Sequence, residues 1–200
     1  MDRFEQSRLI LGSGSLWDLA TCARFLDAVG DGTVPDEAFR RWLVQDYLFV
    51  CGFADFAALT ASKTPRPGQR VVISGLAALN DELDWFEEHA RSRGLDLGVD
   101  PLPVCRRYVD FLIASAYRHS SPVLLAIFYA VEVAYTVAWG RLAPTGPYAE
   151  FIERWTNPQF QEYVAALMGL AERETHPDQQ AAFNEVLRHE HDFWRMTWEG

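Results

Sequence analysis

The chain has 200 residues, of which 49% are hydrophobic and 14% aromatic, so it can bury a sizeable core and is not expected to be disordered. Its formal net charge of −10 argues against a nucleic-acid binder, which would carry a basic stripe or patch, and disfavours an anionic membrane surface. The three cysteines are far apart and form neither a disulfide framework nor a CxxC metal site, which favours a reducing, cytoplasmic setting.

Apolar residues recur at helical spacing along almost the whole chain, and strand signals are nearly absent. Residues 1–15 have no basic segment followed by an apolar core, so we expect an N-terminal extension rather than a secretory signal. Short connections and no long linker predict a single all-α domain over residues 1–200, an antiparallel bundle of about seven or eight helices. The predicted helices cover residues 16–29, 35–63, 69–93, 104–119 and 121–142, and two or more fill 148–173 and 178–198.

Glu132 is the only charged residue between Ser120 and Gly140, in a segment that is otherwise aliphatic, aromatic or small. A helix that is apolar nearly all round belongs in the middle of a protein. The segment is also long enough to span a membrane, but a central charge is costly there and the amphipathic neighbours need a core partner. An isolated buried carboxylate is costly unless it is paired or protonated, so Glu132 marks a candidate site.

Two further acids lie on apolar faces when each helix is counted at about 100° per residue. Asp46 shares a wedge with Phe39, Leu43, Val50 and Phe53. Glu190 lies at the centre of the face formed by Phe183, Leu187 and Trp194. Any one of these acids could be a cap, an ion-pair partner or a rim residue. Three acids that meet in one core would raise one another's pKa through desolvation and repulsion, as acid–base sites near neutral pH require.

Carboxylates that converge in a helical bundle can also hold a di-iron or di-manganese centre, which takes about four carboxylates and two histidines. Glu82 and His89 are seven residues apart, a spacing that some helical di-iron oxidases use. No histidine lies between residues 120 and 175, and His189 and His191 point to different helical faces. We therefore expect no metal site, and Tyr108 and Tyr135 are left as either ligand-binding hydroxyls or ordinary core residues.

Several segments resemble the TenA (thiaminase II) family, which has a heme-oxygenase-like helical fold without haem. The segment FRRWLVQDYLFVCGFADFAA at 39–58 is similar to the family's F-x-x-[WY]-L-x-Q-D segment, and EHDFWRM at 190–196 to its E-x-x-F-W signature. The resemblance implies that Asp46 grips an aminopyrimidine ring and that Glu190 is the catalytic glutamate. It also places three aromatic residues at pocket positions, namely Phe49, Tyr108 and Tyr135.

The better-known branch of this family carries a nucleophilic cysteine in a segment like A-L-x-P-C-x-x-x-Y, which here reads AIFYAVEVAY at 126–135. The chain therefore resembles a second branch, in which a glutamate serves in place of the cysteine, and Glu132 is that glutamate. Trp155 replaces a pocket tyrosine of the cysteine branch. The segments DELDWFEE at 81–88 and WTNPQFQEYV at 155–164 also resemble the glutamate branch.

This resemblance implies a hydrolase of thiamin salvage that acts on aminopyrimidines, either by releasing an amine or by cleaving an N-formyl amide. Glu132 would activate water as a general base and Glu190 would protonate the departing nitrogen, with no metal and no cofactor. The expected partners are a small pyrimidine and further copies of the chain, in a dimer or tetramer, rather than nucleic acid or membrane. A heme-oxygenase-like di-iron oxidase and a non-catalytic ligand-binding or regulatory protein remain the alternatives.

Overall fold

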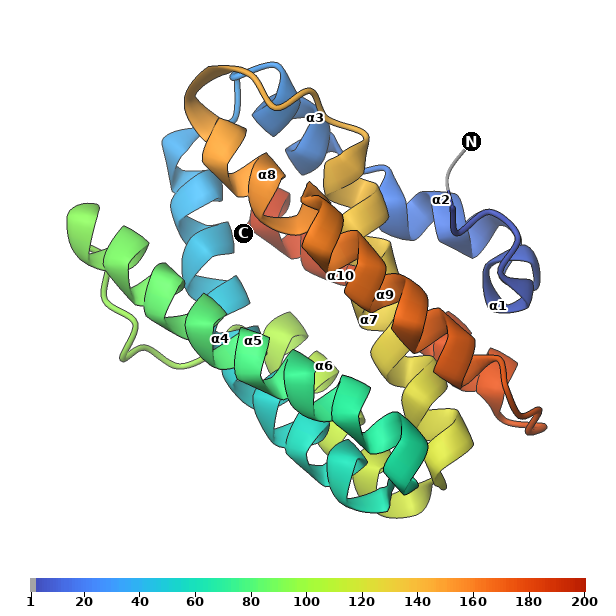
Figure 1. The fold of residues 1–200 in the computed structure, drawn as a ribbon. Helices are drawn as coiled ribbons and strands as arrows, with labels where there is room; N and C mark the ends of the chain where they lie inside the picture. Colours follow the sequence, from blue (N-terminus) through green and yellow to red (C-terminus); the bar gives the residue numbers. More distant parts are fainter. Residues whose placement is uncertain (1–2) are drawn as a thin grey trace.

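A computed structural model describes residues 3–200. Over this range the chain is all-α, as predicted, with ten α-helices and one 3-10 helix, and it shows no strand (Figure 1). The elements are α1 (Arg8–Leu11), α2 (Ser15–Thr21), α3 (Arg24–Gly30), α4 (Asp36–Lys63), α5 (Arg66–Ser92), α6 (Pro103–Arg118), α7 (Ser121–Gly140), η1 (Gly146–Tyr148), α8 (Ala149–Thr156), α9 (Pro158–Ala171) and α10 (Gln179–Glu199).

The fold has more helices than expected because some predicted segments are divided and because α1 lies in the predicted N-terminal extension. The helix predicted over 16–29 is two helices, since Cys22 and Ala23 are extended. The Trp194 indole N–H donates to the Ala20 carbonyl oxygen at 2.9 Å, which occupies an acceptor that a continuous helix would use. Pro158 separates α8 from α9, because proline cannot donate to the preceding turn, and the Asn157 side chain caps α9.

Helix α7 is the central element of the bundle, with α9 and α10 beside it, while α4 packs against α5 and α6 (Figure 1). Sixteen of the twenty residues of α7 are buried, which confirms the prediction that this apolar helix lies in the core. By length and composition both α4 and α7 could cross a membrane, but 89% of the apolar window of α7 and 50% of that of α4 are buried inside the fold. The apolar surface of α7 is therefore covered by the protein's own helices.

Candidate active site

Asp46 lies on α4 and is held by a chain of buried hydrogen bonds. The Tyr135 hydroxyl donates to Asp46 Oδ2 at 2.7 Å, and the Trp42 indole N–H donates to the same tyrosine oxygen at 3.1 Å. Trp42 and Asp46 are one turn apart on α4, so both face Tyr135 on α7. Asp46 is 2% exposed, and the Tyr135 hydrogen bond fixes the orientation of its carboxyl group.

Glu190 lies on α10 and is also paired with a tyrosine. The Tyr108 hydroxyl donates to Glu190 Oε1 at 2.6 Å, from α6, and both residues are buried. The Tyr108 ring packs on Phe49, with centroids 4.6 Å apart, and on His189, with centroids 4.9 Å apart. The predicted residues Phe49, Tyr108 and Glu190 therefore form one connected group.

Glu132 is 7% exposed on α7, and its hydrogen-bond partner is a residue that the sequence reasoning did not select. The Tyr163 hydroxyl, from α9, donates to Glu132 Oε1 at 3.2 Å. Tyr163 fits there because Gly75 on α5 has no side chain: a Cβ at this glycine would collide with the tyrosine hydroxyl. A small residue on α5 thus positions the donor that Glu132 uses.

A small cavity brings several of these residues together. It has a volume of about 20 Å³, enough for one water molecule. Two of the three predicted acids, Asp46 and Glu132, line it. Glu190 does not line it, but its partner Tyr108 packs on Phe49, which does. The remaining lining residues are Val50, Phe53, Leu79, Glu82, Val131, Tyr135 and Trp155.

The electrostatic setting of the acids favours their neutral forms. Burial, reinforced by the charges of Glu82 and Glu190, raises the pKa of Glu132 to about 8 even though the Tyr163 hydrogen bond opposes it. Burial also raises the pKa of Glu190 to about 8, against the Tyr108 hydrogen bond. Burial raises the pKa of Asp46 well above its ordinary value, and Glu82 and Glu190 add to the effect. Two carboxyl groups that titrate near neutrality can exchange protons with a substrate.

Glu82 on α5 is a fourth carboxylate of this group that the sequence reasoning considered only as a metal ligand. The Trp155 indole N–H donates to Glu82 Oε1 at 2.9 Å. Burial raises the pKa of Glu82, while Arg154 and the Trp155 hydrogen bond lower it. The residue could have been found by the same helical count, because it lies between Leu79 and Phe86, which are both buried on α5.

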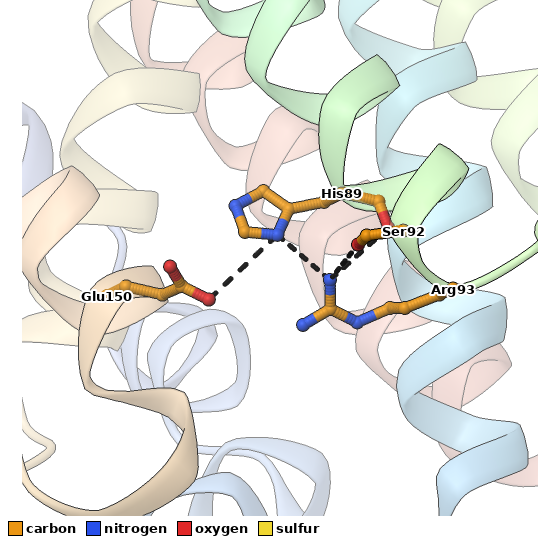
Figure 2. A network of polar contacts seen from close by, with 4 residues as sticks. All are labelled: His89, Ser92, Arg93 and Glu150. Carbon is orange, nitrogen blue, oxygen red and sulfur yellow. Dashed lines mark hydrogen bonds and ion pairs between the residues drawn. The ribbon is translucent and has the colours of Figure 1, made fainter.

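Trp155 is positioned by contacts with α7 and by a contact between α5 and α8 farther along. The Thr136 hydroxyl donates to the Trp155 carbonyl oxygen at 2.6 Å. Figure 2 shows Glu150 of α8 reaching toward His89 of α5, while Arg93 approaches the same ring nitrogen from the other side. Because an arginine only donates, His89 Nδ1 is the acceptor of this 2.9 Å bond. Burial and, to a smaller extent, the charge of Arg93 lower the pKa of the imidazole, whereas the charge of Glu150 raises it.

Two observations concern the di-iron or di-manganese centre that converging carboxylates could hold. Among residues 3–200, no three His, Cys, Asp or Glu side chains gather in a group that could hold a metal ion. Glu82 and His89, the pair with di-iron spacing, belong to different polar networks, one with Trp155 and the other with Arg93 and Glu150.

Residues 16–200 match the sequence profile of the TENA/THI-4/PQQC family. The chain belongs to this family. A soybean (Glycine max) relative described as a probable bifunctional TENA-E protein is 29% identical over 91% of this chain and 88% of its own length. The aminopyrimidine aminohydrolase of Halalkalibacterium halodurans is 24% identical over 92% of this chain and 90% of its own length. The family thus includes enzymes of aminopyrimidine hydrolysis, at a distance from this member.

Solved structures agree with the family assignment. A TenA homologue from Pyrococcus furiosus superposes with a TM-score of 0.87 and 29% sequence identity, over 95% of this chain and 98% of that one. The chain also superposes on a Shewanella denitrificans domain with a heme oxygenase-like fold, with a TM-score of 0.76 over 99% of this chain and 94% of that one. That likeness, at 13% identity, confirms the predicted fold.

Proposed function

We propose that this TenA family member hydrolyses a C–N bond of a thiamin-salvage aminopyrimidine by acid–base catalysis, as a glutamate-branch member without a catalytic cysteine. The observation that carries the proposal is the shared cavity: Asp46 and Glu132 line one small, aromatic-walled space in the core. None of the three cysteines lines it. Burial and the charges of Asp46 and Cys51 raise the pKa of Cys105 to about 12, which makes this thiol a poor nucleophile.

Asp46 is suited to orient a pyrimidine ring. Its Oδ2 is already occupied by the Tyr135 hydroxyl, so the other oxygen would accept from the exocyclic amine or a ring N–H of the substrate. Phe49, Tyr135 and Trp155 supply apolar faces against which a flat heterocycle packs.

The two glutamates supply the proton transfers. In the proposed reaction Glu132 takes a proton from water while the water oxygen bonds to the substrate carbon. At an aminomethyl carbon the C–N bond breaks as the C–O bond forms, whereas at a formyl carbon it breaks after water has added. In both cases Glu190 gives its proton to the departing nitrogen. An aminomethyl substrate yields an alcohol and ammonia, and a formylamino substrate yields formate and an amine. Because water attacks directly, no covalent link to the protein is needed.

The substrate would need more room than the inner cavity offers, since ligand pockets commonly measure roughly 300–1,000 Å³. A second pocket of about 290 Å³ lies between α5, α8 and α9. Glu82 and Trp155 line both spaces, so they form the wall between them. In the proposed bound state this wall moves and the two spaces become one.

Steady-state hydrolysis of aminomethyl- and formylaminomethyl-pyrimidines, followed by NMR of the products, tests the proposal. Glu132→Gln and Glu190→Gln should each lower kcat by about 10²–10⁴-fold, the usual contribution of a positioned acid or base. Asp46→Asn should mainly raise KM. Glu88→Gln, on the exposed side of α5, is the control and should match the wild type. The assignment is refuted if the wild-type protein hydrolyses neither substrate, or if Glu132→Gln hydrolyses them at the wild-type rate.

A further inference from the structure

Glu82 connects the buried acids with the outside of the protein. It lines the inner cavity together with Asp46 and Glu132, and it lines the outer pocket together with Arg154 and Tyr163. Its carboxylate is fixed in this wall by the 2.9 Å bond from Trp155. Glu132 lines the inner cavity only, so of Glu82 and Glu132 it is Glu82 that lines both the inner cavity and the outer pocket.

We propose that Glu82 is a positioning residue that shares a proton with Glu132 across the inner cavity and passes it to water in the outer pocket. The cavity between them holds about one water molecule, which is the medium for the transfer. The proposed sharing is based on the common lining of this cavity, whereas its part in turnover rests on the proposed function.

Turnover creates the need for such an exit. After one reaction Glu132 holds the proton taken from water, and Glu190 has lost the proton given to the leaving nitrogen. Neither group is ready for the next substrate until Glu132 gives up a proton and Glu190 gains one. A proton that moves from Glu132 to Glu82, and from Glu82 to solvent, restores the base, and Glu190 takes one proton back from solvent. The charges balance over the cycle without an added reactant.

The groups that face this pair come from every neighbouring helix. The charge of Glu190 on α10 raises the pKa of Glu132, and the hydrogen bond from Tyr163 on α9 lowers it. The charge of Glu132 in turn raises the pKa of Tyr108 on α6. Glu82 also acts on Asp46 of α4.

Arg154 of α8 is the cation that acts on Glu82, and it favours the ionised form of that carboxylate. The positive charge near Glu82 and the acids near Glu132 place the resting proton on Glu132 more often than on Glu82, and only the molecules in which Glu132 has released it are ready to react.

Titration of the protein by NMR, with ¹³C-labelled glutamate carboxyl groups and no substrate, tests the sharing. Glu82→Gln should lower the midpoint of Glu132 by about one pH unit, a tenfold change in proton affinity. The control Asp81→Asn removes the charge next to Glu82 in sequence, on the exposed rim of the outer pocket, and should shift the midpoint of Glu132 far less. Because coupling is reciprocal, Glu132→Gln should lower the midpoint of Glu82 equally, which decides the question even if Glu82→Gln does not fold.

A rapid-mixing experiment with the aminomethyl-pyrimidine tests the exit. In Glu82→Gln, equilibrated with buffer before mixing, the first turnover should be as fast as in the wild type or faster, because Glu132 is ionised in more of the molecules. Later turnovers should slow by about tenfold or more, since regeneration of the base is impaired. Unshifted midpoints in both variants overturn the sharing, and equal slowing of first and later turnovers overturns the exit. A wild-type protein that hydrolyses no aminopyrimidine refutes the proposed function but leaves the NMR result to stand on its own.

Discussion

Replacing Glu132 by glutamine should make the protein more stable at alkaline pH. In the folded state the pKa of this group is raised from 4.5 to about 8, so the folded protein binds a proton that the unfolded chain has already released. Stability therefore falls as the pH rises from the unfolded value through the folded one. Glutamine keeps the shape of the side chain and cannot ionise, so the variant escapes this loss.

The size of the effect follows from the shift. Each unit corresponds to about 1.4 kcal/mol, so the full cost above the folded pKa is at most about 5 kcal/mol. Between about pH 5.5 and about pH 8.5 the advantage of the variant should grow by about 3 kcal/mol. Urea unfolding of both proteins at these two pH values measures it, with exposed Glu88→Gln as the control. A difference that does not change with pH would show that Glu132 does not titrate in this range and would refute the reasoning.

Two further predictions concern the tyrosine partners of the acids. Tyr108→Phe removes a hydrogen bond that lowers the pKa of Glu190, so the alkaline limb of the plot of kcat/KM against pH should move to higher pH. A limb at the wild-type position contradicts the acid role of Glu190. Gly75→Ala should lower the free energy of unfolding by about 1–3 kcal/mol because it displaces the Tyr163 hydroxyl. Gly169→Ala, with open space around it on α9, should raise the free energy of unfolding by about 0.5–1 kcal/mol. Equal effects of the two substitutions in thermal melts would contradict the tight contact at Gly75.

Much of the fold could be predicted because the apolar period fixes helices locally. The bounds expected for the helices that became α5 and α6 differ from the observed ones by one to three residues. The division of α2 from α3 could not be predicted, since the indole that takes the Ala20 carbonyl lies 174 residues away in sequence. The division of α8 from α9 has a local cause that the sequence displays, an asparagine cap followed by Pro158.

The candidate site shows the same limit. Helical counting placed Asp46, Glu132 and Glu190 in the core, and all three are buried. Their hydrogen-bond partners depend on how helices pack, which the period does not specify. Tyr163 reaches Glu132 because α9 meets α5 at a glycine, and a count along one helix contains no such information. The roles of these residues in catalysis remain predictions.

The narrow inner cavity has a consequence for binding kinetics. If the resting site has space for about one water molecule, a ring fits only after side chains that line it, such as those of Glu82 and Trp155, have moved. The measured dissociation constant would then equal the intrinsic one divided by the fraction of molecules that are open, so affinity would understate the quality of the contacts. Association would be slow and would saturate at the opening rate. A substitution that loosens the wall would bind pyrimidines more tightly while weakening the resting fold.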